Sequence, residues 1–308
     1  MPARSFPKGK GKGNVRLMKI AIASGKGGTG KTTVATNLAW VAARKGHSVS
    51  YLDCDVEEPN GHLFLKPEIT ASRPIGRLHP EVDEEKCIHC GLCGEICQYS
   101  AIVCIGEKVL VYPELCHSCG GCVLVCRPRA ITEVLRESGK LEIGQAGPVN
   151  FVHGLLNIGE AMSTPLIRQV KEAAPESGLV IIDAPPGASC PVMESVRGTD
   201  FVLLVTEPTP FGLNDLKLAV EMVRALKRPL GVAINRAGSG DDQTREYCRL
   251  QGIDILAEIP DDRRVAEAYS RGVLASEALP EIRTRFEDLL GRLLGNGSSR
   301  VTGRGYPA

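Results

Sequence analysis

The feature that most constrains this chain is a glycine-rich run, GKGGTGKTT, at residues 25–33. A short apolar run at Lys19–Ala23 precedes it and a helical pattern at Lys31–Arg44 follows, which is the strand–loop–helix context of a phosphate-binding loop. Glycines let backbone N–H groups point at phosphate oxygens without a Cβ in the way, and the helix N-terminus adds partial positive charge. We therefore predict a nucleotide site formed by Gly25, Lys26, Gly27, Gly28, Thr29, Gly30, Lys31, Thr32 and Thr33.

Two side chains of this loop have distinct expected roles. Lys31 should reach the β- and γ-phosphates, and the Thr32 hydroxyl should coordinate Mg²⁺. Further along, Asp53 and Asp55 follow one apolar run, and Asp183 ends another. Carboxylates at such strand ends hold Mg²⁺ directly or through water, or activate an attacking water molecule. The alternative is that these aspartates only cap the ends of strands.

The rest of the chain alternates between two kinds of segment. Short apolar runs, interpreted as buried parallel strands, recur at Val49–Asp53, Leu179–Asp183, Phe201–Thr206 and Leu230–Asn235. Helical patterns lie at Asn214–Lys227 and Asp261–Arg271, and an amphipathic segment at Glu281–Leu294 is interpreted as a last helix that packs on the core. This alternation predicts an α/β fold with a doubly wound, mostly parallel sheet.

The second residue of the loop, Lys26, is unusual for a phosphate-binding loop. At this point the sequence resembles the deviant Walker A family, which includes ParA, MinD, Mrp and the nitrogenase iron protein. In that family this lysine crosses a dimer interface to the partner's nucleotide, so the resemblance implies ATP as the ligand and an ATP-dependent homodimer. It further implies catalytic roles for Lys26, Lys31, Asp55 and Asp183, Mg²⁺ near Thr32, Asp53 and Asp55, and adenine contacts by Asn235 and the run that begins at Ile259.

Twelve cysteines are present, and eight of them fall between residues 87 and 126 in two copies of the spacing C-x2-C-x2-C-x3-C, each ending in Ala-Ile. Three cysteines in one loop can wrap one face of a [4Fe–4S] cube while the fourth points to the other cluster. This predicts one cluster held by Cys87, Cys90, Cys93 and Cys126 and a second held by Cys116, Cys119, Cys122 and Cys97. The pattern is similar to bacterial two-cluster ferredoxins, although Gln98 and Arg127 stand where proline is usual.

Other interpretations of the cysteine runs stay open. Thiolates in groups of four also bind zinc, although two C-x2-C pairs are the usual zinc arrangement. A purely structural role for the clusters is a further alternative to electron transfer. Cys190, seven residues after Asp183, is interpreted as a packed small residue rather than as a cluster ligand at a dimer interface.

Changes in local amino-acid composition along the chain predict its division into domains. Frequent Pro, Gly and Cys set residues 66–135 apart as an inserted, small α+β ferredoxin-like domain with two [4Fe–4S] clusters. Residues 17–65 and 136–295 are expected to form the two parts of the ATPase domain, and residues 1–16 and 296–308 to be disordered tails, the first of them basic.

Composition excludes several classes of partner. The net charge is +1 and aromatic residues make up 4% of the chain, so we expect no specific binding of nucleic acid. No apolar run has the roughly 18 residues that span a bilayer, so we expect no membrane association. Cysteines clustered at metal-ligand spacing are typical of a reducing compartment, which predicts a cytoplasmic location.

The phosphate-binding loop and the cysteine runs together resemble MinD-superfamily ATPases with an inserted ferredoxin domain. That resemblance implies a homodimer in which ATP hydrolysis gates electron flow from the clusters to an unidentified redox partner protein. One alternative is a positioning or assembly ATPase, like MinD and ParA, whose clusters sense redox state. Another is a cluster carrier like Mrp, although the C-x2-C pair of that family near the C-terminal end is absent here.

Overall fold

The computed structural model describes residues 17–299 of the chain, and its centre is one nine-stranded sheet. The strand order is β11-β10-β9-β1-β8-β2-β7-β6-β3, and neighbours from β11 to β7 are parallel whereas β6 and β3 join in antiparallel pairs. The strands are β1 (Met18–Ala23), β2 (Val49–Asp53), β3 (Glu68–Val82), β6 (Ile131–Ala146), β7 (Val149–Leu156), β8 (Leu179–Asp183), β9 (Phe201–Thr206), β10 (Leu230–Ala237) and β11 (Ile255–Pro260).

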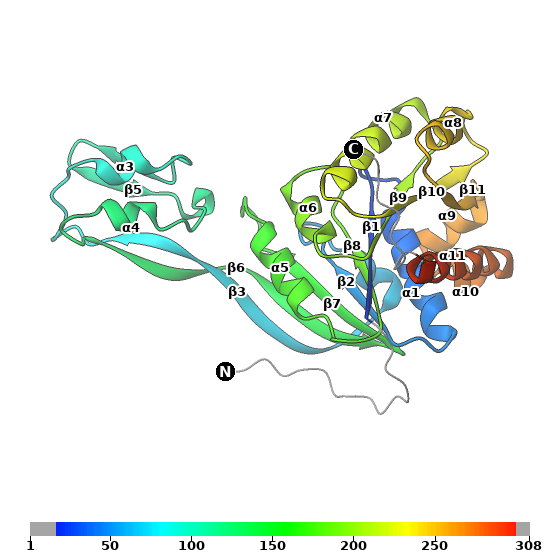
Figure 1. The fold of residues 1–308 in the computed structure, drawn as a ribbon. Helices are drawn as coiled ribbons and strands as arrows, with labels where there is room; N and C mark the ends of the chain where they lie inside the picture. Colours follow the sequence, from blue (N-terminus) through cyan, green and yellow to red (C-terminus); the bar gives the residue numbers. More distant parts are fainter. Residues whose placement is uncertain (1–16, 300–308) are drawn as a thin grey trace.

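Helices cover both faces of the parallel part of this sheet (Figure 1). One face packs on α1 (Lys31–Arg44), α10 (Ala275–Ala278) and α11 (Pro280–Ser299). The other packs on α5 (Thr164–Glu172), α6 (Cys190–Val196), α7 (Pro210–Ala225) and α8 (Gln243–Leu250). Two short helices, α2 (Gly61–Leu65) and α9 (Arg263–Ser270), lie in the remaining connections.

Strand β1 shows why the central strands are continuous apolar runs. Its residues Ile20 and Ile22 pack into the core on the α1 side, whereas Ala21 and Ala23 pack into the core on the opposite side. Alternate residues of a strand point to opposite faces, so a strand covered on both faces has few positions for a polar residue. The carboxylates Asp53 and Asp183 accordingly stand at the ends of such strands.

Strands β3 and β6 extend beyond the sheet as a two-stranded arm (Figure 1). Only the second half of β6 pairs with β7, from Gly139 onward. At this point β6 has a bulge, because Ile75 of β3 pairs with Gly139 and Gly76 pairs with Glu137, which leaves Ser138 as the extra residue. Beyond the bulge the two strands pair only with each other, from Gly76 to Val82 on β3. We call this part of the two strands the arm.

Residues 83–130 form a small module at the end of the arm. Its elements are α3 (Leu92–Ile96), the hairpin of β4 (Ile102–Ile105) and β5 (Lys108–Val111), a 3₁₀ turn at Pro113–Leu115, and α4 (Gly121–Val125). Its apolar core is small, with Cys93, Ile102 and Ile131 as the buried residues. Such a core is too small to stabilise a domain by itself.

The structure confirms the α/β fold and several elements to the residue, namely the helix at Lys31–Arg44 and the strands at Val49–Asp53, Leu179–Asp183 and Phe201–Thr206. Strands β3, β6 and β7 were not among the predicted strands. Residues 1–16 and 300–308 lie outside the described part of the chain, and residues 296–299 belong to the end of α11. Within residues 17–299, no helix has the length and apolarity to cross a bilayer.

Candidate functional site

A cavity of about 470 Å³ opens at the carboxyl ends of the parallel strands. This edge is where α/β sheets bind their ligands, because loops from neighbouring strands converge there. Nine of the residues predicted for the nucleotide site line it, namely Lys26, Gly27, Gly28, Gly30, Lys31, Thr32, Thr33, Asp55 and Asn235. The cavity also has lining residues that the motifs did not single out, among them Glu58, Asn60, Arg236 and Tyr269.

The glycine-rich loop adopts a conformation that side chains would disturb. Gly30 has φ of +87°, and a Cβ added there would lie 2.2 Å from the side-chain amide nitrogen Nδ2 of Asn235. That nitrogen donates a 2.8 Å hydrogen bond to the carbonyl of Thr29. At the start of the loop, a Cβ on Gly25 would lie 2.1 Å from the carbonyl oxygen of Asp215 in α7. The loop is therefore fixed from both sides, by β10 and by α7.

Lys31 is held by carboxylates at the base of the cavity. Its Nζ lies 2.9 Å from Asp183 Oδ1 and 3.6 Å from Asp55 Oδ2. Burial works to lower the pKa of the Lys31 ammonium, but the charges of Asp183 and Asp55 outweigh it and raise that pKa. Tyr51 donates a 2.9 Å hydrogen bond to the other oxygen of Asp183. Lys31 is thus charged and oriented before a phosphate arrives.

The three predicted aspartates occupy different positions. Asp55 lines the cavity, and burial raises the pKa of its carboxyl to about 6 although Lys31 opposes that shift. Asp183 is fully buried behind Lys31. Asp53 is also fully buried, and it accepts hydrogen bonds from the backbone N–H groups of Gly61 at 2.9 Å and Asp55 at 3.2 Å. In this geometry Asp53 shapes the loop that carries Asp55 and does not line the cavity.

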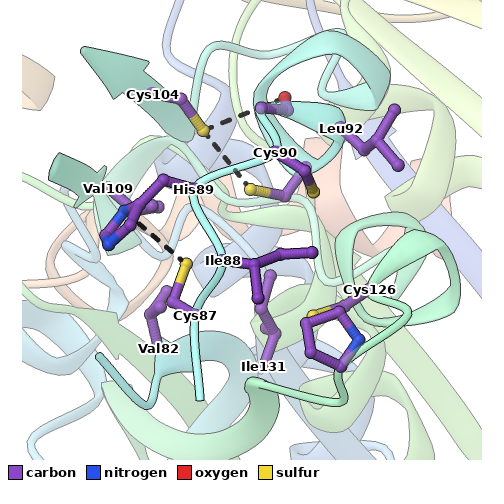
Figure 2. Close-up of a pocket in the computed structure, with 13 residues that line it drawn as sticks. Val82, Cys87, Ile88, His89, Cys90, Leu92, Cys104, Val109, Cys126 and Ile131 are labelled. Carbon is purple, nitrogen blue, oxygen red and sulfur yellow. Dashed lines mark hydrogen bonds between the residues drawn. The ribbon is translucent and has the colours of Figure 1, made fainter. Parts of the chain in front are cut away.

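The module holds two further small cavities. We call them the first and second cavity. The first is lined by Cys87, Cys90, Cys93 and Cys126, and it is shown in Figure 2. The second is lined by Cys116, Cys119, Cys122 and Cys97. Each cavity therefore receives three cysteines from one run and the fourth cysteine of the other run.

The backbone repeats between the two cysteine runs as the sequence does. His89 and Ser118, which stand at the same place in the two runs, both have φ of +53°. The pair Gly91 and Gly120 also has positive φ, and the helices α3 and α4 begin directly after these glycines. The internal repeat is thus a structural one, with each loop wrapped around its own cavity.

The first cavity is also lined by a fifth cysteine, Cys104, which the spacing argument did not include. The Sγ of Cys104, on β4, lies 3.5 Å from that of Cys93 (Figure 2). The signal was available, since Cys104 follows the first cysteine run closely in sequence. Across residues 17–299, no group of three or more His, Cys, Asp or Glu side chains is close enough to hold one metal ion. Cys190 is exposed at the first residue of α6.

The arm connects the module with the sheet through a charged network that sequence reasoning also missed. The guanidinium of Arg77 contacts the carboxylate of Glu160, in the loop after β7, and the backbone carbonyls of Glu114 and Cys116. Arg136 of β6 pairs with Glu160 at 2.7 Å and with Glu114 at 3.0 Å. These partners are far apart in sequence, so no local sequence pattern indicates that they form ion pairs.

A phosphate-type loop at the carboxyl ends of parallel strands, with a buried lysine and carboxylates converging on one cavity, defines a P-loop nucleotide-binding protein. The chain belongs to the CobQ/CobB/MinD/ParA nucleotide binding domain family, whose family model matches residues 20–275.

Similar proteins agree with this assignment. An uncharacterized protein of Methanocaldococcus jannaschii is 31% identical over 281 residues, which is 90% of this chain and 96% of that protein. An iron–sulfur cluster carrier protein of Pyrococcus furiosus is 23% identical over 312 residues, or 92% of this chain and 90% of that protein. The fold is similar to that of the septum site-determining protein MinD of Pyrococcus horikoshii OT3 complexed with Mg-ADP, with a TM-score of 0.57, 20% identity, and coverage of 93% of this chain and 98% of that one.

Proposed function

We propose that this chain is an ATP-hydrolysing iron–sulfur protein that couples a nucleotide-switched homodimer to electron transfer through two [4Fe–4S] clusters. One observation carries the proposal. The eight cysteines of the two runs divide into two cavities, three from one run with the fourth from the other. The four cysteine sulfurs that hold a [4Fe–4S] cluster are kept apart by the cluster between them, one sulfur on each iron. Such a cluster therefore requires a cavity surrounded by four cysteines.

The donor set around these cavities suits such a cube. Thiolates are the usual ligands of iron–sulfur clusters, and hydrogen bonds to their sulfurs support the reduced state. The backbone N–H of Ser118 lies 3.3 Å from Cys116 Sγ, and that of Ala130 lies 3.2 Å from Cys126 Sγ. When bound, the clusters would supply one-electron transfer, for which the surrounding protein sets the potential.

At the nucleotide site, the chain offers the groups that ATP hydrolysis needs. We propose that Lys31 shifts its contact from Asp55 to the phosphates, leaving Asp55 free to position water and Mg²⁺ together with Thr32. Lys26 lines the cavity and makes no ion pair among the described residues. That freedom supports its proposed role of reaching the nucleotide of a second copy and stabilising negative charge there.

Two other functions are alternatives to this proposal, and each predicts a different experimental result. A positioning or assembly ATPase with redox-sensing clusters would change its ATPase rate on reduction without delivering electrons. A cluster carrier is favoured by the name of the relative from P. furiosus, which is an iron–sulfur cluster carrier protein. A carrier would pass its clusters to an apo-acceptor, whereas an electron-transfer protein keeps them through many turnovers.

The decisive experiment uses anaerobically purified full-length protein. Iron and sulfide are measured first, and zinc in their place would contradict the proposal. The reduction potentials are then titrated by EPR with and without Mg·ATP, using Lys31→Ala as the control that should lose any ATP effect. We expect ATP to change the potentials or the rate of electron delivery to a one-electron acceptor. Iron that leaves the protein for an apo-acceptor, without electron delivery, would instead establish the carrier function.

A further inference from the structure

The internal repeat continues beyond the cysteines and makes the two cavities chemically different. When Cys116 is aligned with Cys87, the residue that corresponds to Cys104 is Glu133. Both lie two residues after the Ile of the Ala-Ile ending, near the start of β4 and β6 respectively. Cys104 lines the first cavity and Glu133 lines the second. The same structural position therefore presents a thiol to one cavity and a carboxylate to the other.

In the first cavity, the ligand sulfurs have side-chain hydrogen-bond donors. Cys104 Sγ lies 3.5 Å from Cys93 Sγ, and a ligating Cys93 has no proton, so only Cys104 can donate in that pair; the Gly91 carbonyl oxygen, 3.8 Å away, is the other acceptor within reach of its thiol. The Nδ1 of His89 lies 3.9 Å from Cys87 Sγ (Figure 2). A hydrogen bond to a ligand sulfur stabilises the added negative charge of the reduced cluster and raises its potential.

In the second cavity, the corresponding position adds negative charge. A Cβ built on Gly120, in the loop that carries Cys119 and Cys122, would lie 3.8 Å from Glu133 Oε1. Glu133 has no ion-pair partner among residues 17–299. An unpaired carboxylate disfavours an added electron nearby, although solvent screens part of the effect because Glu133 is exposed.

Other charges near the second cavity largely cancel. Next to Cys116, the network of the arm brings together the cations Arg77 and Arg136 and the carboxylates Glu114 and Glu160, and these are joined in ion pairs. Of these five charged residues, Glu133 is the one without an ion pair in the described part of the chain.

From this asymmetry we infer that the two clusters have different reduction potentials. The cluster in the first cavity has the higher potential because Cys104 raises it, and the cluster in the second cavity has the lower potential because Glu133 lowers it. A one-electron reductant that reduces the second cluster is itself oxidised by one electron, and that electron then moves to the first cluster. The move oxidises the second cluster by one electron and reduces the first by one, with no bond made or broken. The inference rests on the proposed function, because it requires a cluster in each cavity.

The test is an EPR-monitored titration of the anaerobic full-length protein with dithionite. Cys104→Ala should lower the higher of two potentials and leave the lower unchanged, and Cys104→Ser, which keeps a donor, should restore it in part. Glu133→Gln should raise the lower potential alone. Each shift should reach about a tenfold change in the ratio of reduced to oxidised cluster, which is about 59 mV for one electron. Glu107→Gln, in the turn between β4 and β5, is the matched control that removes a charge away from both cavities.

Each result bears on the inference separately from the proposed function. If the native protein lacks the iron and sulfide of two clusters, the proposed function fails and the inference with it. If both clusters are present but have equal potentials, or if Glu133→Gln and Cys104→Ala move neither, the inference alone is overturned. The native titration and the Glu133→Gln variant decide the matter even if Cys104→Ala loses the first cluster.

Discussion

The guanidinium of Arg77 and the carboxylate of Glu160 lie 2.5 Å apart, and the Glu160 side chain is only 1% exposed. This pair joins the arm to the loop that follows β7. Four residues before Glu160, the N–H of Leu156 donates to the carbonyl of Val56 at 2.9 Å, and Val56 follows Asp55 directly. A continuous set of contacts therefore runs from the nucleotide cavity to Cys116, which lines the second cavity.

Replacing Arg77 should loosen this connection without removing the clusters. Arg77→Gln leaves the buried carboxylate of Glu160 with Arg136 alone, and a lost hydrogen bond to a charged group costs about 1.5–3 kcal/mol. We expect faster amide hydrogen exchange at residues 113–116 and in the arm, with unchanged iron content. Hydrogen exchange followed by mass spectrometry measures both segments.

The matched control for Arg77 is Glu114→Gln. Its carboxylate is 44% exposed and pairs with Arg136 at 3.0 Å. Exposed pairs contribute about 0–1 kcal/mol, so exchange should change little. Equal protection of residues 113–116 in the native protein and in Arg77→Gln would show that the pair does not hold the module.

Lys31→Ala should weaken nucleotide binding. The ammonium is the charge that meets the phosphates, and without it the carboxylates of Asp183 and Asp55 would repel them. A hydrogen bond to a charged group contributes about 1.5–3 kcal/mol, so the Kd for Mg·ATP should rise by about 10- to 100-fold or more. Isothermal titration calorimetry measures it, and an unchanged Kd would exclude this cavity as the ATP site.

Lys26→Ala should separate binding from dimer formation. Because Lys26 makes no ion pair among the described residues, its loss should leave the fold unchanged. We expect a single chain to bind ATP still, while ATP-dependent dimerisation and hydrolysis are lost. Sedimentation velocity with and without ATP gives the oligomeric state. A variant that dimerises and hydrolyses normally would argue against a lysine acting across the interface.

Gly30→Ala should disrupt the loop more than its backbone strain alone predicts. Gly30 and Gly46 have the same φ of +87°, but a Cβ would meet Asn235 at 2.2 Å only in the first case. At Gly46 there is open space, so Gly46→Ala costs about 1–2 kcal/mol for its conformation and should keep ATP affinity. Gly30→Ala must also displace Asn235 or the loop. Equal ATP affinity in the two variants would contradict the proposed role of the Asn235 contact.

Removing iron should unfold the module and spare the ATPase domain. Because the core cluster contains only Cys93, Ile102 and Ile131 as buried residues, we expect the module to need bound metal for its stability. After chelation we expect fast hydrogen exchange at residues 83–130 and continued protection of β1 and β8. A module that stays protected without iron would show that its small core suffices.

The parts of the fold that could be predicted share a physical origin. β2, β8 and β9 are buried on both faces, so each is a continuous apolar run with clear ends. The glycine-rich loop and the first three cysteines of each run are local patterns as well, because in each case residues that are neighbours in sequence line one cavity. Hence residues that line the nucleotide cavity and both module cavities could be named before the structure.

The parts that were missed depend on contacts between distant residues. β3 contains Pro74, Gly76 and Pro80, and its first seven residues are exposed, so neither apolar content nor alternation marks it as a strand. Its partner β6 supplies the pairing that the sequence of β3 does not signal. Asp53 shows a related limit, because the sequence placed it at a strand end but could not show that Gly61 and Asp55 occupy its oxygens.

The chain leaves the arm at Val82 and returns at Ile131, and these two residues are paired neighbours across β3 and β6. A hairpin closed there by a two-residue turn would keep the order and the register of all nine strands. Removal of residues 83–130 with closure by such a turn would therefore leave the strands that carry the nucleotide site in place. The antiparallel edge of the sheet is thus a position where a segment can be inserted without changing the path of the chain through the parallel strands.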